Sequence, residues 1–144
     1  MQEWLGVVDG YSIDENINSV GSIGTTKEIL VIDDDPDVLN LFTDFLKREG
    51  FRTASYLDPL AALREIRGSP HRYSLVITDI RMPGISGLEI IKKVSQINQE
   101  IKVILISAFE LDGDNLKGIK YEDFIKKPVH LRSLAETIDK ILKS

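Results

Sequence analysis

The stretch ILVIDDDP, from Ile29 to Pro36, decides the fold of this chain. Its four apolar residues, three of them β-branched, form a short run without alternation, which predicts a strand over Glu28–Ile32 that is buried on both faces. The aspartate-proline pair that starts at Asp35 is typical of a helix start, because a carboxylate caps free backbone N–H groups and proline fits the first helical position. A buried strand followed at once by a helix indicates an α/β protein.

The same strand–helix unit recurs along the chain. Asp58-Pro59 repeats the helix-start chemistry, and the residues SGLE at 86–89 have the pattern of a capping box that opens a third helix. We expect strands over Glu28–Ile32, Phe51–Tyr56, Tyr73–Thr78, Ile101–Ile106 and Asp123–Lys126, and a final helix over Leu131–Leu142. This alternation predicts a doubly wound parallel sheet, with right-handed crossovers, helices on both faces and the strand order 2-1-3-4-5.

Apolar spacing also predicts which side of each helix is buried, because residues three and four apart share a helix face. The expected stripe of the first helix, which Gly50 ends, is Val38, Leu41, Phe42, Phe45 and Leu46. The expected stripe of the second helix is Leu60, Leu63 and Ile66. We expect both stripes to pack against the sheet.

Composition excludes several classes of protein. A chain of 144 residues can form one domain with its own core, and 42% apolar and 28% charged residues are ordinary for a globular protein. The absence of cysteine excludes disulfides, thiolate metal sites and a cysteine nucleophile, and His71 and His130 are too few for a multi-histidine metal site. The formal net charge of −5 argues against binding to nucleic acid or to an anionic membrane.

The N-terminal segment differs from the rest of the chain. Residues 1–26 have four acidic and no basic side chains and no sustained period, so we expect a flexible tail before a domain over residues 27–144. Docking of this tail through Trp4, Leu5, Val7 and Val8 is the alternative. Because the N-terminus lacks a basic region and no apolar run reaches about 18 residues, we expect a cytoplasmic protein without membrane insertion.

Residues with useful chemistry follow the strands. In an open parallel sheet, ligands bind beyond the carboxyl ends of the strands, where the strand order reverses. Asp33 and Asp34 follow strand one, Asp79 follows the neighbouring strand three, and Ser107 and Lys127 follow strands four and five. Close carboxylates repel one another by roughly 4 kcal/mol per pair, which a chain tolerates when a divalent cation such as Mg²⁺ belongs to the working state. A lysine and a hydroxyl nearby suit phosphoryl oxygens, so the pattern predicts a phosphoryl-aspartate site with a carboxylate nucleophile.

These strand ends resemble the receiver domains of two-component response regulators. The resemblance rests on four segments in the family's order: ILVIDDDP at residues 29–36, LVITDIRMPG at 75–84, ILISA at 104–108 and FIKKP at 124–128. It covers the chain from Lys27 to about Leu142 and implies a flavodoxin-like (βα)5 fold. Each segment alone is a weak signal, and the four together at four strand ends are a strong one.

The resemblance implies a role for each matching position around the metal. Asp79 would accept the phosphoryl group. Asp34 would bind Mg²⁺ directly and Asp33 would act largely through water. Asp79 and the backbone carbonyl of Arg81 would complete the metal ligands that the protein supplies.

Other matching positions are implied to respond to phosphorylation. Ser107 would hydrogen-bond the phosphoryl group, and Lys127, whose peptide bond to the next proline is usually cis in the family, would pair with the phosphoryl oxygens. Phe124 takes the position of a switch aromatic. Arg81 and Phe109 occupy the positions that control water access in the family. Because neither side chain would orient a water molecule, we expect slow self-hydrolysis of the phosphoaspartate.

The chain departs from the family between Ser107 and Lys127. Residues 109–118 contain two glycines and few helix-forming residues, so we expect a fourth helix that is short or irregular. In much of the family the fourth helix, fifth strand and fifth helix form the output surface. The departure therefore falls on the surface that the family's usual dimer also uses.

We expect a phosphorylation-dependent signalling switch of a two-component phosphorelay. It would not be an enzyme, apart from promoting its own phosphoryl transfer and slow autodephosphorylation. The expected partners are a sensor histidine kinase or a phosphotransfer protein and a downstream target protein, with a homodimer on phosphorylation as a further expectation. The alternative is a receiver fold that serves as a scaffold or dimerisation module without phosphorylation.

Three other classes of protein fit less well. A phosphatase of the haloacid dehalogenase type would use Asp33-x-Asp35, but Asp37 stands where its motif has threonine or valine. A flavodoxin-type flavin carrier needs a hydroxyl-rich phosphate loop where this chain has three carboxylates. An EF-hand loop that began at Asp33 would have Val38 in place of its glycine and Pro36 inside the loop.

Overall fold

Five parallel strands form the central sheet of the computed structural model, which describes residues 7–8, 10–11, 27–111 and 113–143. The strands are β3 (Glu28–Ile32), β4 (Thr53–Tyr56), β5 (Tyr73–Asp79), β6 (Lys102–Ser107) and β7 (Asp123–Lys126), in the spatial order β4-β3-β5-β6-β7. Counted from residue 28, this is the order 2-1-3-4-5. The predicted fold class is therefore confirmed, and each strand starts and ends within two residues of its predicted position.

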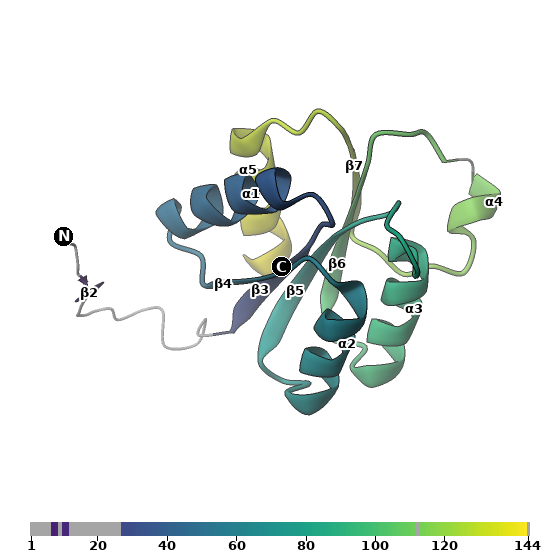
Figure 1. The fold of residues 1–144 in the computed structure, drawn as a ribbon, viewed down its shortest axis with the longest axis horizontal. Coiled ribbons are helices and arrows are strands. Elements are labelled where there is room, and N and C mark those ends of the chain that lie inside the picture. Colours follow the sequence, from purple (N-terminus) through teal and green to yellow (C-terminus); the bar gives the residue numbers. More distant parts are fainter. Residues whose placement is uncertain (1–6, 9, 12–26, 112, 144) are drawn as a thin grey trace.

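Helices cover both faces of the sheet (Figure 1). The helices α1 (Pro36–Arg48) and α5 (Leu131–Lys143) lie together on one face, and α2 (Pro59–Gly68) and α3 (Gly87–Ile97) lie on the other. The helix α4 (Gly113–Leu116), beyond β6 and β7, is a single turn. The predicted short fourth helix is thus confirmed.

Side-chain caps start three of the helices, as the sequence predicts. The Asp35 carboxylate accepts a hydrogen bond from the backbone N–H of Asp37 at 2.9 Å, and Asp58 and Ser86 cap α2 and α3 in the same way. Each capping residue lies in the loop that joins a strand to the next helix, namely β3 to α1, β4 to α2 and β5 to α3. The caps therefore fix where the chain turns at the carboxyl edge of the sheet.

Alternate strand residues contribute to apolar cores on opposite faces, as the pleat of a strand requires. The core on the α1 and α5 side comprises Ile29, Val31, Leu39, Phe42, Leu46, Leu75, Ile77, Ile104, Ile106, Leu134 and Ile138. The core on the α2 and α3 side includes Leu30, Ile32, Ala62, Leu63, Ile66, Val76, Ile90 and Val94. Because both faces of the strands are buried, polar side chains can gather only beyond the strand ends.

Two leucines contradict the predicted helix stripes. Leu41 is 56% exposed and Leu60 is 50% exposed. At about 100° per residue, Leu41 lies roughly 200° around α1 from the buried Leu39, and Leu60 lies about 100° around α2 from the buried Pro59. Spacing alone was ambiguous because two overlapping apolar stripes exist in each helix, and only the packing shows which one faces the sheet.

Near the N-terminus, β1 (Val7–Val8) and β2 (Gly10–Tyr11) form an antiparallel pair that is not part of the main sheet. Trp4, Leu5 and most of the predicted tail lie outside the described residues, so the tail over residues 1–26 stays a prediction. Within the ranges that the structure describes, no helix has the length and apolar character needed to span a membrane.

Candidate functional site

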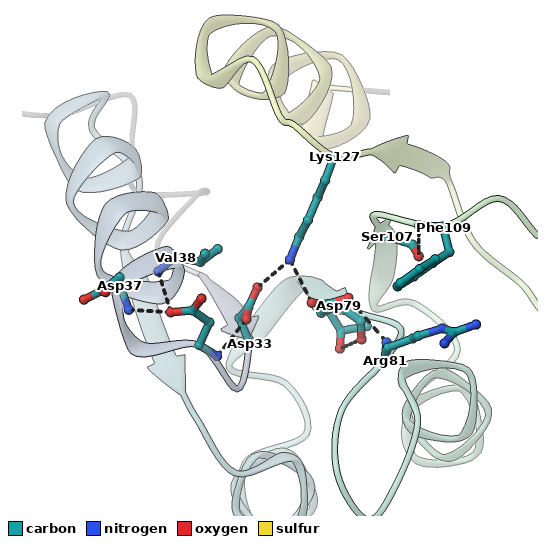
Figure 2. A network of polar contacts seen from close by, with 10 residues as sticks. Asp33, Asp37, Val38, Asp79, Arg81, Ser107, Phe109 and Lys127 are labelled. Atoms are coloured by element: carbon teal, nitrogen blue, oxygen red, sulfur yellow. Dashed lines mark hydrogen bonds and ion pairs between the residues drawn. The ribbon is translucent and has the colours of Figure 1, made fainter.

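Four of the predicted site residues lie along the carboxyl edge of the sheet, each brought there by the end of a strand (Figure 2). Asp33 follows β3, Asp79 ends β5, Ser107 ends β6 and Lys127 follows β7. The strands β3 and β5 are neighbours, and the chain leaves them toward opposite faces of the sheet. Their ends therefore meet without a helix between them, which is the usual ligand position of this class of fold.

Three carboxylates meet at these ends. Asp33, Asp34 and Asp79 each place one oxygen within 4.8 Å of the others. Asp33 and Asp79 are buried, whereas Asp34 is exposed. Burial raises the pKa of Asp33, against the opposing effects of the Asp35 N–H and the Lys127 charge, and the nearby charge of Asp79 raises it further. Three carboxylates share one lysine, Lys127, so the cluster has an excess of negative charge.

Lys127 lies between the two buried carboxylates (Figure 2). Its Nζ is 2.8 Å from Oδ2 of Asp79 and 3.4 Å from Oδ2 of Asp33. Burial lowers the pKa of Lys127, but the hydrogen bond to Asp79 and the charges of both aspartates outweigh that effect and leave the pKa above its usual value. The lysine is therefore held as a cation. Its peptide bond to Pro128 is cis, as the resemblance implies.

Backbone hydrogen bonds orient the other oxygen of each buried carboxylate. Oδ1 of Asp33 accepts a hydrogen bond from the Asp35 N–H at 2.9 Å, and Oδ1 of Asp79 accepts one from the Arg81 N–H at 3.3 Å. The turn after each strand thus binds one oxygen. The second oxygen of each residue is left to face the lysine.

The two residues expected to control water access are in contact with each other. The guanidinium carbon of Arg81 lies 4.1 Å from the centroid of the Phe109 ring, a cation–π distance. Phe109 is 51% exposed, and its N–H donates a hydrogen bond of 3.0 Å to Oγ of the buried Ser107. Figure 2 shows the ring beside Asp79 and Ser107. The β6–α4 loop therefore reaches back to the loop after β5.

Phe124 lies in an apolar environment. It is half-buried and packs with Leu111 and Tyr121 against the core residues Ile80, Ile91, Val103 and Leu105. Its backbone N–H donates a hydrogen bond of 2.8 Å to Oδ1 of Asp123, at the start of β7. Its role as a switch stays a prediction.

The carboxylate cluster fits a magnesium ion. Mg²⁺ binds oxygen at about 2.1 Å in octahedral geometry, so opposite ligands lie about 4.2 Å apart. Neighbouring ligands of the octahedron lie closer together, about 3 Å apart. The three carboxylate oxygens lie within 4.8 Å of one another, so small side-chain adjustments let one ion contact some of them directly and the rest through its own water molecules. Carboxylates with access to water are the donors that Mg²⁺ prefers, and exposed Asp34 provides this access.

Two further polar groups near the site have no distinguishing sequence signal. The Thr78 hydroxyl is buried and donates a hydrogen bond of 2.8 Å to the backbone carbonyl of Asp79. Lys126 forms an exposed ion pair with Glu110 at 2.9 Å, which joins the β6–α4 loop to the end of β7. Both contacts depend on tertiary positions, because threonine in a buried strand and charges in a loop are common.

Comparison with known proteins identifies the family. The model of the response regulator receiver domain matches residues 29–139 of this chain. The chain belongs to the receiver domains of two-component response regulators. Receiver domains are signalling domains and not conventional enzymes.

Several curated relatives have the same extent as this domain. The polar-differentiation response regulator DivK of Brucella ovis is 32% identical over 124 residues, which cover 81% of this chain and 97% of DivK. The response regulator receiver protein CpdR of Brucella abortus is 29% identical over 121 residues, again 81% and 97% of the two chains. The response regulator GtcR of Aneurinibacillus migulanus is 36% identical over 105 residues, which cover 72% of this chain and 42% of GtcR.

Solved structures show the same fold. The response regulator TrrA of Thermotoga maritima, in complex with Mg(2+)-BeF, is 31% identical with a TM-score of 0.72, over 80% of this chain and 98% of that one. A CheY-like receiver domain protein from Methanospirillum hungatei is 25% identical with a TM-score of 0.76, over 81% and 94%. The five-stranded doubly wound fold is therefore the fold of the family.

Proposed function

We propose that this chain is a phosphorylation-dependent signalling switch that accepts a phosphoryl group on Asp79 from a histidine kinase or a phosphotransfer protein. The observation that carries the proposal is the Lys127 amino group, which lies between the buried carboxylates of Asp33 and Asp79. A structural ion pair needs only one carboxylate. Two buried ones beside an exposed third make a site with spare negative charge, which suits a metal ion and a nucleophile.

In the transfer, one oxygen of Asp79 attacks the phosphorus atom of the donor. A new P–O bond forms, the bond between phosphorus and the donor breaks, and the donor leaves with the electron pair. The Lys127 cation, already 2.8 Å from Asp79, pairs with the oxygens of the transferred group. The Ser107 hydroxyl, at the end of the neighbouring strand, donates a hydrogen bond to one of them.

The residues that would hold Mg²⁺ are Asp34, Asp79 and the backbone carbonyl of Arg81, with Asp33 acting through water. Bound Mg²⁺ supplies positive charge to the phosphoryl oxygens during transfer. Asp33 suits an indirect role because it is more deeply buried than Asp79, and its Oδ1 accepts a shorter backbone hydrogen bond, 2.9 Å from the Asp35 N–H against 3.3 Å from the Arg81 N–H to Asp79. Asp34 suits a direct role because its side chain is exposed.

The Arg81–Phe109 contact supports a long-lived phosphorylated state. Hydrolysis requires a water molecule in line with the bond between phosphorus and the Asp79 oxygen. Arg81 has no acceptor to orient such a water, and Phe109 is apolar. Since the ring lies 4.1 Å from the guanidinium, the two side chains hold each other beside the site. Autodephosphorylation is therefore slow, with a half-life of minutes to hours as an order of magnitude.

The signal leaves the domain through protein contacts. Ser107 links the phosphoryl group to the β6–α4 loop, because its Oγ already accepts the Phe109 N–H. Phe124, packed in the apolar cluster beneath that loop, is the switch aromatic of this proposal. A downstream target protein, or a second copy of the chain in a phosphorylation-dependent homodimer, would read the change on α4, β7 and α5.

Phosphorylation by a small-molecule donor tests the proposal. The full chain is incubated with acetyl phosphate and Mg²⁺, and its intact mass is measured. We expect the mass gain of one phosphoryl group, which Asp79→Asn and chelation of the metal abolish. The matched control is Asp37→Asn, which removes an exposed carboxylate of the first turn of α1 and leaves the modification intact.

The same experiment distinguishes the alternative function. If wild type stays unmodified with acetyl phosphate and with a phosphorylated phosphotransfer protein, the chain is a receiver-fold scaffold and the proposal is wrong. A mass gain that persists in Asp79→Asn would instead reject Asp79 as the acceptor.

A further inference from the structure

We propose that Gly87 is a positioning residue, which together with Thr78 holds the backbone of Asp79 in the geometry that the site needs. The inference rests on the proposed function of Asp79. A Cβ atom on Gly87 would collide with the carbonyl oxygen of Asp79 and would lie 2.8 Å from Cα of Ile80. Both are backbone atoms that cannot rotate away. Any other residue at position 87 must therefore displace the start of α3 or the end of β5.

The peptide unit that follows Asp79 is held from three sides. The Ile80 N–H donates to the Ile106 carbonyl at 3.0 Å, and the Ile80 carbonyl accepts from the Gly87 N–H at 2.8 Å. The Asp79 carbonyl accepts from the Thr78 hydroxyl at 2.8 Å. Three backbone groups thus have fixed partners: the Asp79 carbonyl, the Ile80 N–H and the Ile80 carbonyl. Thr78 and Gly87 supply two of these three partners.

This arrangement matters because two proposed metal donors depend on the same short backbone. The Asp79 carboxylate is attached directly to it, and Arg81 is the next residue after Ile80. Sites that bind metals or transfer groups tolerate displacements of only about 0.5 Å before they lose function. Because a side chain at position 87 forces a larger shift, the loss should appear in metal affinity as well as in stability.

Gly68 provides a matched control. It is the last residue of α2, and apart from its chain neighbours and the adjoining helix backbone no atom lies within 4 Å of where its Cβ would be. Gly87→Ala and Gly68→Ala therefore change the same atoms, at a crowded and at an open position. The two variants separate the close approach to Asp79 from the general effect of replacing a helical glycine.

The first experiment measures the Mg²⁺ dissociation constant of both variants by isothermal titration calorimetry, at a temperature where the near-ultraviolet circular dichroism of each is native. We expect Gly87→Ala to bind Mg²⁺ at least about ten-fold more weakly than wild type, and Gly68→Ala to stay within about two-fold. A residue that served stability alone would lower the melting temperature and leave the affinity of the folded protein unchanged. A folded Gly87→Ala variant with wild-type affinity overturns the proposal.

A second variant decides the case in which Gly87→Ala does not fold. Thr78→Val keeps the shape of the buried side chain and removes the hydroxyl that binds the Asp79 carbonyl. We expect its Mg²⁺ affinity to fall by about three-fold with a native near-ultraviolet spectrum. Unchanged affinity in Thr78→Val overturns the proposal.

A metal-free measurement separates this inference from the proposed function. If wild type itself does not bind Mg²⁺, the proposed metal site fails, and the test is made on ¹H–¹⁵N spectra without metal. The amide signals of Asp79 and Ile80 should then move in Thr78→Val and in folded Gly87→Ala, and stay in place in Gly68→Ala. Unmoved signals in both site variants overturn the positioning role.

Discussion

Replacing Lys127 by alanine tests the charge balance of the site. The substitution removes the cation that lies 2.8 Å from Asp79 and 3.4 Å from Asp33, and it leaves both carboxylates buried. Without metal, the two aspartates then repel each other with no opposite charge between them. We expect the variant to be strongly destabilised, unlike Lys126→Ala, which removes the neighbouring lysine from an exposed pair with Glu110.

The magnitude follows from burial. Removing one partner of a buried ion pair costs 3–5 kcal/mol as a rule. The Lys127 side chain is 25% exposed, so the lower end applies, about 3 kcal/mol. In a domain of this size, 1 kcal/mol changes the melting temperature by roughly 4 °C, which gives a decrease of about 12 °C. The Lys126 pair is exposed on both sides and screened by water, so its loss should lower the melting temperature far less.

Magnesium should partly rescue the variant, because the cation replaces the charge that Lys127 supplied. Removing the lysine makes the site more negative by one charge, so we expect Mg²⁺ to bind Lys127→Ala at least about ten-fold more tightly than wild type. At saturating metal this recovers about 1.4 kcal/mol, close to half of the loss. Thermal melts of wild type, Lys127→Ala and Lys126→Ala, with and without Mg²⁺, measure both quantities. Equal melting temperatures of the two lysine variants would refute the reasoning. So would a difference in melting temperature between wild type and Lys127→Ala that grows when Mg²⁺ is added.

Three other changes have defined outcomes. Tyr73→Phe loses the 2.7 Å hydrogen bond to Glu65 and should be about 1 kcal/mol less stable than wild type at pH 7. Because burial raises the pKa of Tyr73 in the folded protein, the unfolded chain ionises first, and the extra stability of wild type in urea unfolding should shrink as the pH rises above about 10. A stability difference that stays constant with pH would contradict this. Asp58→Ala removes the cap of α2 and should cost about 1 kcal/mol in the same assay without changing Mg²⁺ affinity. The double variant Arg81→Asn, Phe109→Glu should lose its phosphoryl group about ten-fold faster or more than wild type, measured as phosphoprotein decay after donor removal. A double variant that decays no faster than wild type would reject control of water access by these two residues.

Local chemistry in the sequence was enough to predict most of the fold. Asp35, Asp58 and Ser86 cap helices where predicted, because a cap depends only on backbone N–H groups two or three residues away. The strand order followed from the alternation of strands and helices, which leaves few topologies. The meeting of Asp33 with Asp79 then followed from their places at the ends of neighbouring strands.

What could not be predicted depends on side-chain direction and close packing. Leu41 is apolar and has the expected spacing, yet it points away from the sheet. The prediction failed because spacing does not determine which of two overlapping apolar stripes the sheet covers. The contact between Arg81 and Phe109 joins two loops whose paths no local pattern fixes. The crowding of Gly87 against Asp79 is equally invisible in a capping-box motif, where glycine is only one of several residues that fit.

The single turn of α4 has a consequence for the energetics of the molecule. Among the residues that the structure describes between β6 and β7, backbone hydrogen bonds join Lys117 to Asp114 and Ile119 to Leu116, and Leu111, Leu116, Ile119 and Tyr121 are only half-buried. Segments of this kind open at a small fraction of the free energy of global unfolding. Amide hydrogens there should exchange with solvent through local openings, while those of β3 and β5 exchange only when the whole domain unfolds. A partner can therefore impose its own shape on this connection at little thermodynamic cost and without disturbing the strands that hold the carboxylates.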